Sequence, residues 1–395
     1  MYALFNFRSL FFIFLCLATM PAMAEKLAAL PVSMQLSRLS ATTWQADYVF
    51  SEAVTALNFE KRGDYRSTAW KVLTPGVRYQ TNEQMDSYVS SQPLKKISVE
   101  IAAYDQYLPK NYAPNNRFTD GGAALYMGFF EGAVQQAGIA RDMVLTVSYQ
   151  GMPGETVIAP PRFADASKSL NAYAYFGPQK PMDAGSAKII IDPATPAWLT
   201  GLILETGTKM SNYYSATYQR PLARELVLMI SVAEFESPGA SMKGGATNGQ
   251  ITYRLSGKSL VKDVPPLRSM VKRLVSHEMA HIWQENVSQG GIGENPAWIH
   301  EGGAEAMAMD ALENTGLWSK DEVDAYKNKA SQTCDKLKDG PPAYERDYAC
   351  GLQNFMNMSL AAPVVWRALI SETDRTGEYY SEAMVNRLAK QVAGK

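Results

Sequence analysis

The chain of 395 residues is long enough for two or three domains, and its 46% hydrophobic and 19% charged residues are typical of a globular protein. Its formal net charge of −1 leaves no basic excess that could neutralise phosphates. Nucleic acid is therefore not expected as an obligatory partner.

The first residues have the features of a secretory signal peptide. Arg8 supplies a positive charge, and the apolar run Leu10–Ala18 is too short to span a bilayer as a helix. Ala22-Met23-Ala24 is a small-x-small cleavage site. We expect residues 1–24 to be removed and the chain from Glu25 to be exported, to the periplasm or the medium, without a stable membrane anchor. An uncleaved anchor is the alternative.

Residues 25–170 are predicted to form an all-β domain. Aromatic and β-branched runs alternate there with Gly, Pro, Asn and Asp turns, as in a sandwich or an open sheet. The expected strands are Trp44–Phe50, Ala56–Glu60, Lys96–Tyr104, Gly122–Phe130 and Val144–Tyr149. The segment 160–185 is rich in Pro, Ala, Ser and Gly and is predicted to be a junction. We find no catalytic constellation in this half.

Residues 171–395 show strands first and helices after them. The expected strands are Ala187–Asp192, the apolar run Leu226–Phe235 and an edge strand at Gly249–Leu255. The run Leu226–Phe235 is nearly continuous, which indicates a strand buried on both faces. Helices are predicted at 196–218, 263–290, from 295 onward, and at 320–336, 352–371 and 378–392. This order predicts an α+β fold in which helices pack on a small sheet.

An H-E-x-x-H sequence begins at His277 and ends at His281. It lies in an apolar pattern of 3.6-residue period, with a helix start near Asp263–Pro265 and a stop at Gly290-Gly291. Four residues correspond to about one helical turn, so both imidazoles can reach one metal ion. Glu278 points toward the same pocket, where it can take a proton from the attacking water.

A second helix is announced by Asn295-Pro296, a cap residue followed by proline. It carries Glu301 and, one turn later, Glu305. A catalytic zinc uses three protein ligands and leaves one position open. We therefore expect one Zn²⁺ per chain, bound by His277, His281 and Glu301. Glu305 is expected to accept the outer N–H of a ligand histidine, and His277 is the better candidate.

These motifs together resemble the gluzincin metallopeptidases, and most closely the aminopeptidase N-like and glycyl aminopeptidase families. H-E-x-x-H is followed by Trp298-Ile299-His300-Glu301-Gly302, similar to the W-L-N-E-G of those families. Nineteen residues separate His281 from Glu301, one more than in the families, and the extra residue fits in the loop 286–295. The resemblance implies an amino-terminal all-β domain followed by a thermolysin-like zinc-peptidase domain. His300 replaces the usual Asn, and a hydrogen bond to backbone or a contact with substrate is expected of it.

The stretch from Gly244 to Arg254 resembles the G-x-M-E-N-x-G-x-I-T-Y-R sequence of the aminopeptidase N-like enzymes. In the family this segment is an edge strand that pairs with substrate backbone. The resemblance assigns that role here to Gly249, Gln250, Ile251, Thr252 and Tyr253. The glutamate that binds the substrate amine is replaced by Ala246. Its absence leaves open whether cleavage is internal or amino-terminal.

Tyr348-Ala349-Cys350-Gly351 resembles the family's Y-x-K-G, with Cys in place of Lys. The resemblance assigns to Tyr348 a hydrogen bond to the oxyanion of the transition state. Only Cys334 and Cys350 would remain after signal cleavage, and an even pair in an exported protein suggests a disulfide. Such a bond would brace the segment that presents Tyr348. Two free buried thiols are the alternative.

The predicted function is that of an exported zinc metallopeptidase acting on a peptide or protein, with Glu278 as general base. Four other interpretations stay open. The chain could be a catalytically impaired, zinc-containing peptide-binding protein on the same fold, or a hydrolase of another amide or ester. It could carry a structural zinc site, although that would prefer a fourth protein ligand. The two histidines could also be ordinary core or surface residues. The oligomeric state is not determined.

Overall fold

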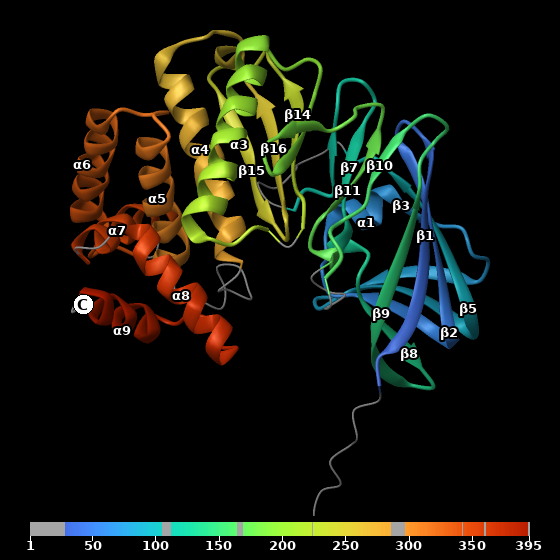
Figure 1. Ribbon diagram of the computed structural model, residues 1–395. Coiled ribbons are helices and arrows are strands. Elements are labelled where there is room, and N and C mark those ends of the chain that lie inside the picture. The colour runs from blue at the N-terminus through green and yellow to red at the C-terminus, as the bar shows by residue number, and fades with distance from the viewer. Residues whose placement is uncertain are drawn as a thin grey trace, which may run out of the picture.

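The structure is a computed structural model that describes residues 28–104, 112–163, 169–222, 224–285, 297–341, 343–358 and 361–393. The expected signal peptide lies outside these residues, as do the predicted helix stop at Gly290-Gly291, the helix start at Asn295-Pro296 and the loop 286–295. Figure 1 shows a β-rich amino-terminal half and a mixed half with its helices on the far side. The α+β class predicted from the sequence is confirmed.

The amino-terminal half contains a seven-stranded sheet of order β1-β9-β8-β2-β5-β3, in which β4 pairs with β5 and β1 also pairs with β2. Alternate side chains of β2 are buried, because successive residues of a strand face opposite sides of the sheet. The two strands expected at Trp44–Phe50 and Ala56–Glu60 are parts of this one strand. The elements are β1 (Leu30–Ser40), β2 (Thr43–Phe59), β3 (Trp70–Val72), β4 (Val77–Thr81), β5 (Asp86–Ala102), β8 (Ala133–Gln136) and β9 (Ile139–Gln150), with the short helices α1 (Asp64–Ala69) and η1 (Met127–Phe129).

A four-stranded sheet of order β10-β11-β7-β6 lies between this sheet and the carboxy-terminal half. Its strands are β6 (Asn115–Arg117), β7 (Ala123–Tyr126), β10 (Thr156–Ile158) and β11 (Tyr173–Gly177). All five residues of β11 are buried, so the prediction of a simple junction at 160–185 is wrong there. The aromatic residues of β11 pack in the core, and β11 pairs with β7. The domain division predicted at residue 170 falls just before β11.

The carboxy-terminal half is organised around a five-stranded sheet of order β12-β13-β14-β16-β15. Its strands are β12 (Met182–Ala184), β13 (Ala187–Ile191), β14 (Leu226–Glu234), β15 (Ser241–Thr247) and β16 (Gln250–Ser256). The first seven residues of β14 are buried, as predicted for this central strand. In Figure 1, α3 (Ala197–Tyr218) and α4 (Pro265–Gln284) lie on one side of the sheet and the four-stranded sheet on the other.

The prediction that Gly249–Leu255 is an edge strand is wrong. β16 pairs with β14 on one side and with β15 on the other, so its backbone groups are already engaged. β15 and β16 form an antiparallel hairpin through Asn248 and Gly249, whose φ of 70° suits a tight turn. Among the described strands, β15 is the edge strand on this side of the sheet and β12 is the other edge. The Asn-Gly pair is the sequence signal that identifies this hairpin.

The remaining elements are η2 (Lys258–Val261), α5 (Ala297–Asn314), α6 (Lys320–Leu337), α7 (Tyr344–Asn357), α8 (Ala362–Thr376) and α9 (Glu382–Ala393). The predicted helix 352–371 is wrong, because it joins the end of α7 to the start of α8. Pro363 occupies the first turn of α8, where proline is well tolerated. No helix within the described ranges is both long and apolar enough to cross a membrane.

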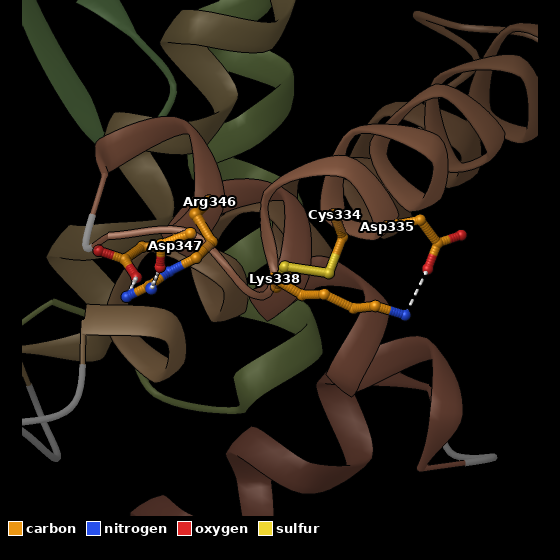
Figure 2. The surroundings of a disulfide bond; sticks show 7 residues. Cys334, Asp335, Lys338, Arg346 and Asp347 are labelled. Carbon is orange, nitrogen blue, oxygen red and sulfur yellow. Dashed lines mark hydrogen bonds and ion pairs between the residues drawn. A yellow bond between two sulfur atoms is a disulfide. The ribbon is translucent and has the colours of Figure 1, made fainter.

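In the structure, a disulfide between Cys334 and Cys350 joins α6 to α7 (Figure 2). Cys334 is 3% exposed and belongs to the helical core. Cys350 lies two residues beyond Tyr348 on the same helix. The bond therefore ties the helix that carries Tyr348 to its neighbour, as predicted.

Replacement of both Cys334 and Cys350 by Ser should lower the free energy of unfolding by about 3 kcal/mol, because the bond closes a loop in the unfolded chain between cysteines that are 16 positions apart. Urea unfolding of the two proteins measures the difference. Thiol labelling of the native, non-reduced protein should find neither cysteine reactive. Two labelled thiols would contradict the bond.

Candidate metal centre and active site

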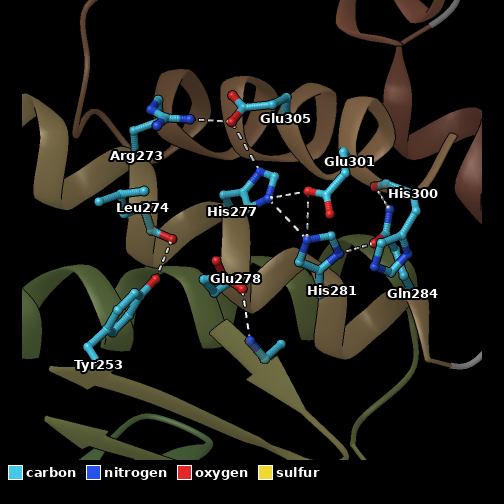
Figure 3. A network of polar contacts seen from close by, with 11 residues as sticks. Tyr253, Arg273, Leu274, His277, Glu278, His281, Gln284, His300, Glu301 and Glu305 are labelled. Atoms are coloured by element: carbon cyan, nitrogen blue, oxygen red, sulfur yellow. Dashed lines mark hydrogen bonds and ion pairs between the residues drawn. The ribbon is translucent and has the colours of Figure 1, made fainter. Parts of the chain in front are cut away.

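The second half of α4 brings two histidines into one buried pocket. His277 and His281 lie one turn apart and are 1% and 7% exposed. Their Nε2 atoms are 3.0 Å apart, and the rings are nearly perpendicular (Figure 3). Both nitrogens therefore face the same point, as the H-E-x-x-H spacing predicts.

Glu301 comes from α5 and completes a group of three ligand atoms. Its Oε2 lies 3.1 Å from the Nε2 atom of His277 and 3.5 Å from that of His281. Ligand atoms at about 2.0–2.1 Å from a tetrahedral ion are about 3.3 Å from one another, so this donor set fits Zn²⁺. Among the described residues this is the one metal-ligand group of His, Cys, Asp and Glu, and it offers three ligands rather than four. That number suits an open catalytic site better than a structural one.

The charges around His277 favour a cation in this pocket. Burial alone would lower the pKa of His277, but hydrogen bonds to Glu301 and Glu305 outweigh it and raise the pKa to about 10. Glu278 adds to this effect through its charge. The pocket thus stabilises positive charge, which a metal ion would supply as well as a proton does.

Glu305 lies behind His277, where the sequence predicts it. Its Oε1 is 3.1 Å from the Nδ1 atom of His277, and the same oxygen accepts a hydrogen bond from Arg273 (Figure 3). Burial disfavours the ionised carboxyl, but the charge of Arg273 and the contact with His277 outweigh it and lower the pKa of Glu305 to about 2. An ionised Glu305 can hold the Nδ1 proton of His277 and leave Nε2 free for a metal.

Sequence reasoning missed Gln284, which lies behind His281. Its Oε1 is 2.5 Å from the Nδ1 atom of His281, and its Nε2 donates to the carbonyl oxygen of His300 at 2.9 Å. Gln284 lies three positions after His281 on α4, a spacing that places two side chains on one helical face. That spacing could have identified it.

The ring of His300 stacks on that of His281, with 4.2 Å between centroids and 18° between planes. Its buried Nδ1 has no hydrogen-bond partner within the described part of the chain, so the predicted bond from this ring nitrogen to backbone is not formed there. The backbone carbonyl of His300 is what engages Gln284. Burial lowers the pKa of His300 to about 3, which keeps the ring neutral.

Glu278 faces a cleft between β15, α4 and α7 and is 8% exposed. Its Oε2 accepts a hydrogen bond of 2.9 Å from the backbone N–H of Ala246, on the edge strand β15. The same cleft is lined by Gly244 of β15 and by Tyr344 and Tyr348 of α7. The predicted base thus lies beside the group of His277, His281 and Glu301, next to the edge strand β15, and lines the cleft.

Tyr348 reaches the metal group from α7. Its ring stacks on that of His277 with centroids 5.0 Å apart, and its hydroxyl bonds to Glu301. Burial and the charges of Glu301 and Glu278 raise the pKa of Tyr348 well above its usual value. The hydroxyl therefore stays protonated and can donate a hydrogen bond.

Two glycines bring α5 and α7 close enough for this contact. A Cβ atom on Gly302 would lie 2.2 Å from the Cα atom of Gly351. One on Gly351 would lie 2.3 Å from the carbonyl oxygen of Trp298. No side chain fits at this crossing, which explains why glycine follows Glu301 and ends the Tyr348 motif.

The structure does not place the predicted substrate-binding residues on an open strand, although Tyr253 lines the cleft. Gln250, Ile251, Thr252 and Tyr253 are buried in β16, and Gly249 lies in the hairpin turn. The side chain of Gln250 exchanges hydrogen bonds with the backbone of Tyr173, and the Tyr253 hydroxyl donates to the carbonyl of Leu274. Both are therefore engaged within the fold, and the assignment of β16 as the substrate edge is wrong.

Comparisons with known proteins give the same fold. Residues 207–337 match the family model described as peptidase of plants and bacteria. An aminopeptidase N family protein from Idiomarina loihiensis superposes with a TM-score of 0.59 at 11% identity, over 90% of this chain and 72% of that one. A mutant M1 zinc metallopeptidase from Deinococcus radiodurans, bound to a Tyr-Ser-Ala substrate, superposes with a TM-score of 0.50 at 14% identity, over 94% of this chain and 91% of that one. No curated protein matches in sequence. The chain shares the two-part fold of the aminopeptidase N family, as the sequence motifs predicted.

Zinc should stabilise the native protein through the group His277, His281 and Glu301. At a hundred times its dissociation constant the gain is about 2.7 kcal/mol. Glu301→Gln should lose most of this gain because one ligand charge is removed, whereas Glu313→Gln, on the same helix, should keep it. Urea unfolding with zinc or with a chelator measures each gain. An equal gain in Glu301→Gln and the unaltered protein would contradict the ligand assignment.

Proposed function

We propose that this chain is an exported zinc-dependent peptidase. The observation that carries the proposal is the buried group of His277, His281 and Glu301, with Glu278 beside it at the end of a cleft. The peptidase family model and the shared fold support the reaction class. Export rests on the predicted signal peptide, residues 1–24.

Zinc would be held by the three ligands and would activate water and polarise the scissile carbonyl. Glu278 is positioned to accept the proton of the attacking water and to pass it to the leaving amine. The hydrogen bond from Ala246 fixes one carboxylate oxygen of Glu278 and leaves the other for this transfer. Tyr348 keeps its proton and can donate a hydrogen bond to the oxyanion.

The edge strand β15 is the better candidate for pairing with substrate backbone. Its outer side has no partner strand among the described elements, and two of its residues, Met242 and Gly244, line the cleft. An extended peptide could therefore add to the sheet beside Glu278. Ala246 offers no carboxylate for a substrate amine, so we propose cleavage within a peptide rather than removal of its first residue.

Glu278→Gln should lower peptide cleavage by at least about 10²-fold, because the amide cannot accept the proton. The experiment incubates the zinc-loaded chain from Glu25 with a mixed peptide library, reads products by mass spectrometry and uses Glu313→Gln as the matched control. Internal cuts that vanish only in Glu278→Gln are expected. Equal product patterns, with zinc bound to both proteins, would indicate a non-catalytic peptide-binding protein instead.

Tyr348→Phe should lower kcat by about 10²–10³-fold with little change in KM, because one donor to the oxyanion is lost while the ring that stacks on His277 remains. Both proteins are assayed at saturating zinc, because the Tyr348 hydroxyl also bonds to the candidate ligand Glu301. Tyr344→Phe is the matched variant, since Tyr344 lines the same cleft. A large fall in kcat in Tyr344→Phe, with none in Tyr348→Phe, would assign the role to Tyr344.

A further inference from the structure

The two histidines of the metal group have different partners on their outer nitrogens. His277 faces the ionised Glu305, and His281 faces the neutral amide of Gln284. Both partners are completely buried, and both are themselves held, Glu305 by Arg273 and Gln284 by the carbonyl of His300. Each ligand histidine therefore has a fixed support, one charged and one uncharged.

The contacts of Gln284 determine which way its amide faces. The carbonyl oxygen of His300 can only accept a hydrogen bond, so the amide nitrogen of Gln284 must face it. The amide oxygen then faces His281 and can only accept from Nδ1. His281 must carry its proton on Nδ1, which leaves the Nε2 lone pair directed at Glu301 and His277.

Neighbouring residues leave little room for another arrangement. The ring of His300 stacks on one face of His281. A Cβ atom on Gly303 would lie 3.1 Å from the amide nitrogen of Gln284 and 2.6 Å from Trp366, so glycine leaves the space that Gln284 occupies. The side chain of Gln284 is enclosed on the side away from His281.

We propose that Gln284 is a positioning residue of the metal centre, which sets the tautomer and the direction of the His281 ring through its amide oxygen. The proposal rests on the zinc site of the proposed function. It extends that site to a residue outside H-E-x-x-H. The neutral amide of Gln284 would accept the outer N–H of His281, as the carboxylate of Glu305 does for His277. Loss of such an outer partner lowers metal affinity by about 10–100-fold.

The test is zinc affinity, measured by competition with a chromophoric chelator and independent of any substrate. Gln284→Met keeps the length of the side chain but removes its acceptor, and it should bind zinc about 10–100-fold more weakly. Gln284→Glu keeps an acceptor oxygen toward His281 but loses the donor to the His300 carbonyl, so it should bind zinc more tightly than Gln284→Met and more weakly than the unaltered protein. Gln353→Met on α7, outside the metal centre, is the matched control and should leave the affinity unchanged.

Circular dichroism of the zinc-free proteins shows whether each variant folds. If Gln284→Met is unfolded without zinc, Gln284→Asn replaces it with the same expected loss, because the shorter side chain withdraws the amide. Affinity equal to that of the unaltered protein would overturn the proposal, as would equal losses in Gln284→Met and Gln284→Glu. Failure of the unaltered chain to bind zinc would instead overturn the proposed function.

Discussion

Three carboxylates and two imidazoles are buried together where α4 meets α5, and burying charge in this way is unfavourable unless opposite charges accompany it. Arg273 compensates Glu305 from one side. The remaining excess of negative charge surrounds His277 and the group that it forms with His281 and Glu301. The pocket therefore favours positive charge, supplied by a proton or by a metal ion, and this preference links the fold to its proposed chemistry.

The surrounding helices hold this group in place because they pack closely against one another. The glycines at the α5–α7 crossing allow Tyr348 to stack on His277, and the disulfide joins α7 to α6. The sheet contributes through its edge, where the Ala246 N–H holds Glu278. The candidate base, metal ligands and tyrosine thus come from three helices, α4, α5 and α7, that are fixed to one another, as pre-organised catalysis requires.

The amino-terminal half is joined to this centre through the back of the five-stranded sheet. Gln250 binds the backbone of β11, and the buried Asp192 accepts hydrogen bonds from Thr119. Gln250, which the sequence predicted to bind substrate, therefore helps to hold the two halves together. Ile251, Thr252 and Tyr253 are buried in β16, which is paired on both sides.

The sequence by itself predicted the candidate ligands and the partner of His277, because helical spacing places His277, His281 and Glu278 in one pocket and sets Glu305 one turn after Glu301. Aromatic and β-branched residues between turn signals likewise predicted the strand at Trp44–Phe50, which is part of β2. Only the tertiary structure decided which strand is the edge, because pairing depends on partners distant in sequence. It also decided how Tyr348 and Gln284 reach the histidines. A helix crossing and the direction of an amide are properties of packed neighbours, and no local pattern encodes them.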